Sequence, residues 1–485
     1  MAKAAKKQNG KTILITICVI LAALLVIGLA AYNRLKNTGI TLRAQKAVES
    51  ENFEVTGTMM PYFISSQYQN ISPYFEYLGV DTSKSLKSQP CPLMEEGSWF
   101  DYIVSGAKQM VGEILSLCEA AKANGVELDD ENKQFIEDTV ESVRATATAG
   151  GYTLNSYLSA MFGSGMNEKD MRACLNLTEL ASKYSTQFTD GLTYTAEDRE
   201  AYYAEHTEDF LTADLYAFET KIADFMLTDT DGNPIGEAAD AVAKVQEAAD
   251  KFDGVKTADE FKALVSAYAI DVLGKTEEEA AQIADDSLAK NVAVNIFGED
   301  VNAWLADAQV GDLYVNAAQK NEDDVTTYDI YLVDRAAARD ETKTRDVRHL
   351  LVSNEEYEDN TEVNRIYAEW EEAGFTEDKL IELVGQYSAD TGSVEAGGLY
   401  TNVAVGDMVT AFNDWLFDES RQTGDHDIVE SEYGWHIMYY VGEGELAGWE
   451  ADADSAMAES DYKKLVEEFG TSVAFNDKVI AKVQG

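Results

Sequence analysis

Two of the four histidines stand at the head of apolar, strand-like runs, and they are the clearest chemical signal in the chain. His349 lies within residues 345–352, RDVRHLLV, and His436 lies within residues 431–437, SEYGWHI. Imidazoles titrate near neutral pH and bond through two ring nitrogens, so a pair of them suits a polar network in a site. A P-loop, a G-x-S-x-G elbow, an H-E-x-x-H helix and a G-x-G-x-x-G turn do not occur in the sequence, which argues against those enzyme classes.

The segment between the two histidines holds further motifs in a defined order. Tyr-Ser-Ala-Asp occupies residues 387–390, Gly-Gly-Leu occupies residues 397–399, and Met408 precedes Phe412 by one helical turn. With the two histidine strands, this order resembles the parvulin (PpiC-like) peptidyl-prolyl isomerase domain. The resemblance covers residues 342–445. It implies a four-stranded antiparallel sheet wrapped by helices, with both histidines on neighbouring central strands.

The resemblance also implies a site for proline isomerisation. Rotation about an X-Pro bond is slow because it breaks amide resonance, and its catalysis needs neither a cofactor nor a nucleophile. In the implied site His349 and His436 share a hydrogen bond at the base, and Asp390 and Ser431 complete the polar network. The proline ring would lie against three apolar side chains, which are those of Leu399, Met408 and Phe412.

Each of these residues also has a plainer structural interpretation. Met408 and Phe412 fit an apolar core equally well, and Asp390 fits a turn or a helix cap. Gly397-Gly398 is most simply a turn. The histidine pair is also compatible with a structural role that shapes the pocket without transferring protons. Tyr400 departs from the family pattern, which often has Gly after the Leu, and the turn is one residue shorter. Catalysis and non-catalytic peptide binding therefore both stay open.

An internal repeat precedes this domain. Residues 212–218 align with residues 344–350, and residues 328–330 align with residues 435–437. Residues 211–339 are therefore predicted to be a degenerate parvulin-like domain. Ala217 and Asp329 stand at its two histidine positions, and the Gly-Gly turn is missing. A chance similarity between two α+β domains is the competing interpretation.

Helical periodicity dominates residues 98–208, where apolar residues recur at three- and four-residue spacing, with Ser98 as the expected first cap. Residues 50–97 hold four of the five prolines and are expected to be irregular. The order of the helices resembles the N-terminal chaperone module of SurA- and PrsA-like foldases, which we assign to residues 33–210. Residues 447–485 are expected to form a helical segment that packs back on this module.

An uncharged, mostly aliphatic run of residues 13–32 is long enough to cross a bilayer as a helix. We predict a transmembrane anchor over residues 12–32 and a basic cytoplasmic tail over residues 1–11. The positive charges that flank the run are balanced on its two sides, so they do not decide the orientation. A short basic tail before an apolar run is typical of a signal sequence. It places residues 33–485 outside the cytoplasm, held at the cell membrane by a single uncleaved span.

The formal net charge of −50 argues against a nucleic-acid or anionic-membrane binding surface, because such surfaces need clustered Lys and Arg. The charge is better explained as a solvated coat that keeps the protein soluble. His206 and His426 match no motif and are expected at the surface.

Neither the cysteines nor the acidic residues predict a metal or a cofactor. Cys91, Cys118 and Cys174 form no C-x-x-C, so a redox motif or a thiolate zinc site is not expected. Cys118 and Cys174 fall on apolar helix stripes and are expected to be small buried side chains. Residues 229–240 have the alternating acids of a calcium loop, but Pro234 stands where the loop needs Gly.

The combined prediction is a membrane-anchored, multidomain α+β chain with a helical chaperone lobe and two parvulin-like domains. The domain boundaries are residues 33–210, 211–339 and 340–446, followed by the tail 447–485. Such a chain would bind unfolded, extended secreted polypeptides and isomerise their X-Pro bonds. A non-catalytic holdase or scaffold, and a surface interaction protein unrelated to folding, are the alternatives. The sequence is also compatible with a homodimer.

Overall fold

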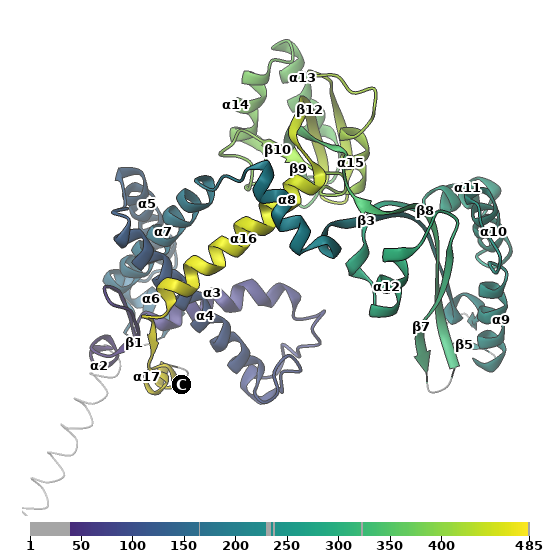
Figure 1. Ribbon diagram of the computed structural model, residues 1–485. Helices are drawn as coiled ribbons and strands as arrows, with labels where there is room; N and C mark the ends of the chain where they lie inside the picture. The colour runs from purple at the N-terminus through teal and green to yellow at the C-terminus, as the bar shows by residue number, and fades with distance from the viewer. Residues whose placement is uncertain (1–38, 164, 229–233, 236–237, 322–323, 484–485) are drawn as a thin grey trace, which may run out of the picture. The chain divides into compact units, whose positions relative to one another are not determined.

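The computed structural model describes residues 39–163, 165–228, 234–235, 238–321 and 324–483 (Figure 1). These residues divide into two compact units. The first unit combines the chain up to Leu192 with the segment from Ala458 onward, and the second unit is Thr193–Met457. The predicted cytoplasmic tail 1–11 and anchor 12–32 lie outside the described residues. Within the described part of the chain, no helix is both long and apolar enough to cross a membrane.

The first unit is built mainly from helices. They are α2 (Ile40–Arg43), α3 (Met60–Ile71), α4 (Trp99–Ala123), α5 (Asp130–Ala149), α6 (Leu154–Phe162), α7 (Glu168–Asp190) and α17 (Asp477–Val483). Helix α4 begins where the sequence predicts, because the Ser98 hydroxyl and the Asp101 carboxylate each bond the backbone N–H of the other residue. The helices enclose one apolar core that includes Met60, Leu115 and Cys174.

The expectation that residues 50–97 are irregular is wrong over α3. Pro61 lies in the first turn of this helix, where a proline has no intrahelical hydrogen bond to lose and its restricted φ fits the helix. The helix buries Met60 and Phe63 in the core. A proline therefore marks the start of a helix here and not its absence.

A small sheet joins the two ends of the first unit. Its strand order is β13 (Ala474–Phe475), β1 (Lys46–Glu49) and β2 (Glu54–Thr56), with both pairs antiparallel. Val479 and Ile480 of α17 are buried in the same core as the helices. The predicted return of the tail to the helical unit therefore holds for the residues from Ala458 onward.

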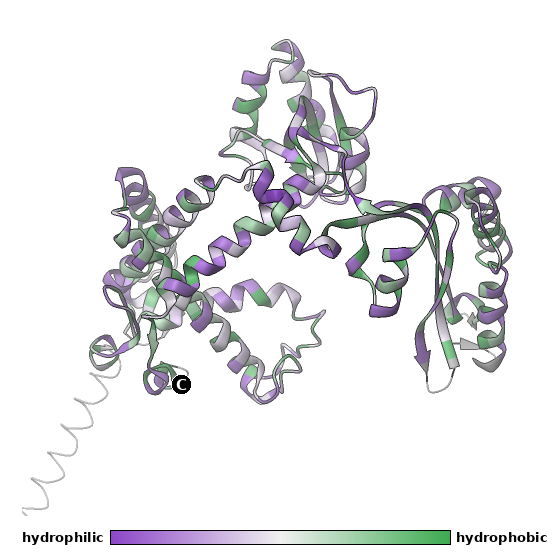
Figure 2. Cartoon of the chain, viewed as in Figure 1, coloured by the Kyte–Doolittle hydropathy of each residue, from purple (hydrophilic) through white to green (hydrophobic). Residues whose placement is uncertain are grey.

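Helix α16 (Gly448–Gly470) begins in the second unit and ends in the first. Figure 2 shows hydrophobic and hydrophilic residues alternating along it. In the second unit, Trp449, Ala453 and Met457 pack with Phe210 and with tyrosines of α8 (Ala196–Glu205). The Arg199 guanidinium holds the Asp454 carboxylate with two bonds of 2.6 and 2.7 Å.

The second unit contains two four-stranded antiparallel sheets with the same order of strands. The first sheet has the order β6 (Leu288–Ala293), β3 (Leu211–Lys221), β8 (Asp324–Arg339), β7 (Leu313–Asn321). The second sheet has the order β10 (Leu399–Val403), β9 (Lys343–Ser353), β12 (Gly434–Ala447), β11 (His426–Ser431). Strands β4 (Leu227–Thr228) and β5 (Pro234–Ile235) form a separate hairpin.

Helices cover both faces of each sheet in the same way (Figure 1). On the first sheet, α9 (Ala238–Asp250), α10 (Ala258–Asp271) and α11 (Glu277–Asp285) pack on one face and α12 (Glu299–Asp307) on the other. On the second sheet, α13 (Thr361–Glu372) and α14 (Glu377–Tyr387) pack on one face and α15 (Thr410–Leu416) on the other.

Candidate active site

The two faces of the second sheet bury different sets of residues. Side chains alternate between faces along a strand, so Leu350, Val352 and Ile437 lie together under α13 and α14. On the opposite face, Val347 and Met438 pack against Phe412 of α15. We call this second side the α15 face.

His349 and His436 both lie on the α15 face, on the neighbouring central strands β9 and β12. Met438 is directly opposite His349, and His436 is opposite Leu351, so the two imidazoles sit on a diagonal. Their Nδ1 atoms are 3.2 Å apart, and each residue is only 5% exposed. The sequence therefore predicts their neighbouring strands and their shared hydrogen bond correctly.

Asp390 and Ser431 extend the pair into a chain of hydrogen bonds. The Asp390 Oδ2 atom is 2.8 Å from His349 Nε2, and the Ser431 hydroxyl is 2.7 Å from His436 Nε2. Two further donors reach the same Oδ2 atom, from the Ser393 hydroxyl at 2.5 Å and the Tyr400 hydroxyl at 3.0 Å. The backbone N–H of Gly392 donates to Oδ1.

Burial and hydrogen bonding set the charges of this chain. The bond from His349 holds the pKa of the Asp390 carboxyl far below its usual range, so this group is an anion at neutral pH. Burial, aided by the nearby His349 ring, lowers the pKa of His436 to about 4, so this imidazole is neutral. The site thus has one fixed negative charge at one end and a neutral ring in the middle.

These charges define the direction of the hydrogen bonds. An ionised carboxylate only accepts, so His349 Nε2–H donates to Asp390. Beyond it, the Nδ1 atoms of His349 and His436 share the second hydrogen bond, and His436 Nε2 shares the third with the Ser431 hydroxyl. The proton on His349 Nε2 is therefore fixed by the carboxylate.

Phe412 closes the apolar side of the site. Its ring centroid is 5.3 Å from that of His349 and 5.5 Å from that of His436, with edge-on geometry in both cases. Phe412 is 2% exposed, and the half-buried Met408 packs on the same apolar cluster. Phe412 therefore lies beside the histidine pair, and Met408 belongs to the apolar cluster that contains Phe412.

The expected position of Leu399 needs correction. Leu399 is opposite Arg348 on β9, so its side chain lies on the face away from the histidines. Tyr400 is opposite Val347 and lies on the α15 face, where its ring centroid is 5.5 Å from that of His349. Tyr400 occupies the place that Leu399 was expected to fill.

The expectation of a surface position is also wrong for His426. Its ring is half-buried, with centroids 4.0 Å from Phe375 and 5.2 Å from Trp370, and its Nδ1 bonds the Gly424 carbonyl oxygen. It packs under α13, on the face opposite the site. His206 stacks on Tyr202 with centroids 4.2 Å apart.

The Gly-Gly turn brings strand β10 against the histidine strand. Gly397 and Gly398 have φ of 64° and 79°, which favours glycine. The backbone N–H of His349 donates to the Gly398 carbonyl oxygen at 2.9 Å. A Cβ atom on Gly398 would lie 2.2 Å from the His349 carbonyl oxygen. The close approach of the two backbones therefore requires glycine at this position.

Residues 330–442 match the family model of the PPIC-type PPIASE domain. The chain carries a parvulin-type peptidyl-prolyl isomerase domain. Over 358 residues the chain is 23% identical to Chaperone SurA of Hahella chejuensis (strain KCTC 2396). The alignment covers 73% of this chain and 75% of that relative. It is also similar to crystal structures of PrsA. The structure of PrsA from Bacillus subtilis has 12% identity and a TM-score of 0.23, and the match covers 82% of this chain and 93% of that structure. The structure of PrsA from Bacillus anthracis has 16% identity and a TM-score of 0.20, and the match covers 55% of this chain and 94% of that structure.

The first sheet reproduces the frame of the parvulin domain without its imidazoles. Ala217 is opposite Tyr331, and Asp329 is opposite Glu219, which is the register that His349 and His436 have in the second sheet. In this sheet Asp329 bonds with Tyr331 and Asn316, and its pKa is raised by burial and by the charge of Glu219. A carboxylate therefore stands where the parvulin domain has a neutral ring.

The remaining candidates for metal or thiol chemistry are the calcium-like segment and the three cysteines Cys91, Cys118 and Cys174. In the described part of the chain, no cluster of His, Cys, Asp and Glu has the makeup of a metal site. The calcium-like segment 229–240 lies mostly outside the described residues. Cys91, Cys118 and Cys174 are buried free thiols, and burial raises the pKa of Cys118 to about 12.

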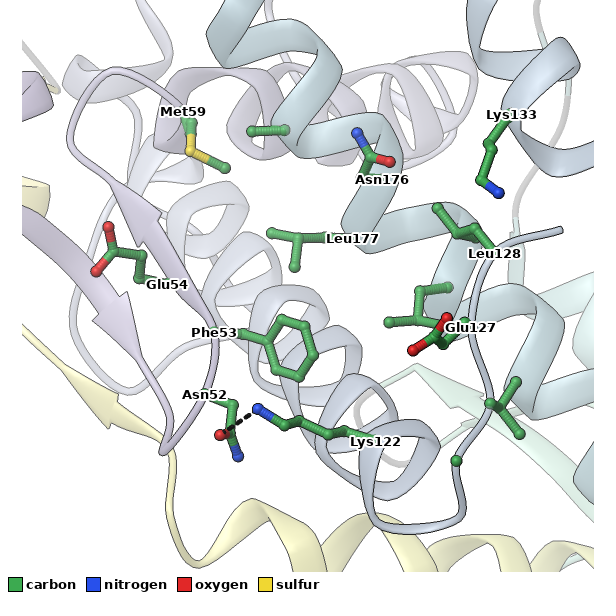
Figure 3. Close-up of a pocket in the computed structure, with 14 residues that line it drawn as sticks. Asn52, Phe53, Glu54, Met59, Lys122, Glu127, Leu128, Lys133, Asn176 and Leu177 are labelled. Atoms are coloured by element: carbon green, nitrogen blue, oxygen red, sulfur yellow. Dashed lines mark hydrogen bonds between the residues drawn. The ribbon is translucent and has the colours of Figure 1, made fainter. Parts of the chain in front are cut away.

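The helical unit holds a cavity of about 660 Å³, far in sequence from the parvulin domain (Figure 3). Apolar side chains line most of it, among them Phe53, Met59 and Leu177. Polar and charged side chains lie around it on several sides, among them Asn52, Lys122, Lys133 and Asn176, as Figure 3 shows. Its lining therefore suits an apolar group that is attached to a polar chain.

Proposed function

We propose that this chain is an extracytoplasmic foldase, which binds extended stretches of unfolded secreted polypeptides and isomerises their X-Pro bonds. The observation that carries the proposal is the buried chain from Ser431 through the two histidines to Asp390, with Phe412 packed against both rings. This arrangement lies within the segment that matches the isomerase family.

The proposed mechanism is pocket complementarity without proton transfer. Rotation of an X-Pro bond moves no proton between heavy atoms, so the site needs only to favour the twisted amide over the planar one. Phe412 and Met408 would hold the proline ring by apolar contact. His349, His436, Asp390 and Ser431 would hold the base of the pocket rigid through their chain of hydrogen bonds.

The other parts of the chain fit the binding half of the proposal. We assign client binding to the cavity of the helical unit, because its apolar lining suits side chains that are buried in folded proteins but exposed in unfolded ones.

The membrane anchor of the proposed foldase would be residues 12–32. A chain that starts at residue 33 should no longer sediment with membranes, and continued sedimentation would remove the anchor from the proposal.

Replacement of Phe412 by Leu in the full chain tests the isomerase assignment. Leucine keeps most of the apolar volume, so the domain should lose less than about 1.5 kcal/mol of stability. Because the aromatic wall is lost, we expect turnover of a proline peptide to fall by about tenfold or more. Phe135, which is 54% exposed on α5, provides the matched control as Phe135→Leu.

A non-catalytic holdase is the second candidate. The first sheet favours it, because that domain keeps the frame but has Ala217 and Asp329 at the histidine positions. The two candidates differ in the same experiment. If the unaltered chain suppresses aggregation of an unfolded protein but does not accelerate proline isomerisation, the holdase is correct and the foldase is wrong.

A further inference from the structure

Tyr400 has no role in the expected site, yet the structure brings it to the centre of that site. It lies on β10 opposite Val347, on the α15 face, and it is half-buried. Its ring packs on the apolar cluster that contains Phe412 and Met408. A residue in this position contacts both the polar and the apolar parts of the site.

The hydroxyl of Tyr400 completes the coordination of one carboxylate oxygen. Asp390 Oδ2 accepts from His349, Ser393 and Tyr400, whereas Oδ1 accepts only the weaker bond from the Gly392 N–H at 3.2 Å. Burial and the bond to Asp390 raise the pKa of Tyr400, so the hydroxyl stays protonated and donates. The carboxylate is thus prevented from turning about its Cβ–Cγ bond.

The orientation of this carboxylate determines that of His349. The imidazole has three ring neighbours, which are Tyr400, Phe412 and His436, with centroids between 5.3 and 5.5 Å away. These contacts confine the ring but do not select which nitrogen carries the proton. The bond from His349 Nε2–H to Asp390 keeps a proton on Nε2 and turns Nδ1 toward His436.

We propose that Tyr400 is a positioning residue of the isomerase site, whose hydroxyl fixes Asp390 and through it the tautomer and orientation of His349. This inference rests on the isomerase activity of the parvulin domain. Tyr400 does not need to contact the reacting amide. Its hydroxyl acts through two hydrogen bonds in series, so its loss should change the rate of the bound substrate more than the binding of the substrate.

The test is Tyr400→Phe in the full chain, which removes one oxygen atom and keeps the ring. We expect kcat for a proline peptide to fall by about fivefold to tenfold, because a bond to a charged group is lost. KM should stay within about twofold, since the apolar wall is retained. Tyr357→Phe is the control, because Tyr357 is 38% exposed and precedes α13.

Side-chain nitrogen NMR provides a readout that a purely structural role would not move. The sequence has only four histidines, so the ring nitrogens of His349 can be assigned by single substitutions. In Tyr400→Phe we expect the His349 nitrogen shifts to move toward an averaged tautomer, whereas loss of a purely structural contact would leave them in place.

Unchanged nitrogen shifts or an unchanged kcat would each overturn the inference. The wild-type rate is a separate control. If the wild-type chain shows no isomerase activity, the proposed function fails, while the NMR shifts still report whether Tyr400 positions His349.

Discussion

Asp390 and His436 belong to the same chain of hydrogen bonds but differ in charge at neutral pH. Asp390 stays charged because three donors meet on one of its oxygens, and His436 stays neutral because it is buried. The neutral ring has a direct consequence for stability, since an unfolded chain exposes His436 to water and lets it take up a proton.

We expect the parvulin domain to lose stability in mild acid because of His436. Its pKa is about 4 when folded, against an ordinary value of 6.5, so the unfolded state binds more protons between these values. The contribution is fully present above pH 6.5 and is lost as the pH falls toward 4. From pH 7 to pH 5 it should amount to about 2 kcal/mol.

Hydrogen exchange of the β9 and β12 amides at these two pH values measures the effect. The variant His436→Gln has no titrating group there and should show a smaller difference between pH 7 and pH 5. Asp390 does not interfere, because its depressed pKa makes its contribution decline only at lower pH. Equal differences in the two proteins would contradict the prediction.

Secondary-structure elements place the site through one close contact between backbones. Strand β10 reaches β9 only because Gly398 adopts a left-handed φ and has no side chain toward the His349 carbonyl oxygen. Arg348 supports the turn from the other face, with bonds from its guanidinium to the carbonyl oxygens of Ala396 and Gly397. The turn thus determines which residues of β10 face the histidines.

Gly398→Ala should therefore damage both stability and activity. The added methyl group clashes with the backbone and strains φ, so we expect a loss of more than about 2 kcal/mol. Gly385→Ala is the matched control, because no atom lies within 4 Å of its added Cβ in α14. That change should stabilise the helix by about 0.5–1 kcal/mol. Urea unfolding of the two variants would contradict the prediction if their stabilities changed in the same direction.

The same turn explains how far the sequence could predict this domain. The two histidines, Phe412 and the central position of the histidine strands follow from the family resemblance, which rests on motifs that are local in the sequence. The choice between Leu399 and Tyr400 does not, because a strand's facing depends on where the preceding turn ends and a shift of one residue exchanges the faces. The aromatic neighbours of His426 come from α13 and the turn after it. The residues next to His426 in the sequence therefore do not predict its burial.

The whole molecule has one unit that is continuous in sequence and one that is not. The second unit is a single stretch, Thr193–Met457, whereas the first unit needs the residues from Ala458 onward to complete its core and its sheet. Tyr462, Leu465, Val466 and Phe469 of α16 pack on that core. The tail is therefore an integral part of the helical unit.

A chain that ends at Met457 should keep the parvulin fold and lose the helical unit. The truncation removes β13 and the buried Val479 and Ile480, and it exposes their partners, so we expect the first unit to lose more than about 3 kcal/mol. Limited proteolysis should cut the helices α3 to α7 quickly while isomerase activity on a short peptide persists. Equal resistance of these helices in both chains would contradict the prediction.

The pairing of β1 with β13 also determines the order in which the two units can finish folding during synthesis. Domains generally fold as units while the chain is still being made, starting from the N-terminus. The second unit has all its residues once Met457 has been made, but β1 must wait for Phe475 before its partner strand exists. The part of the protein that is synthesised first is therefore completed last, and until then it is itself a nascent polypeptide with exposed apolar segments.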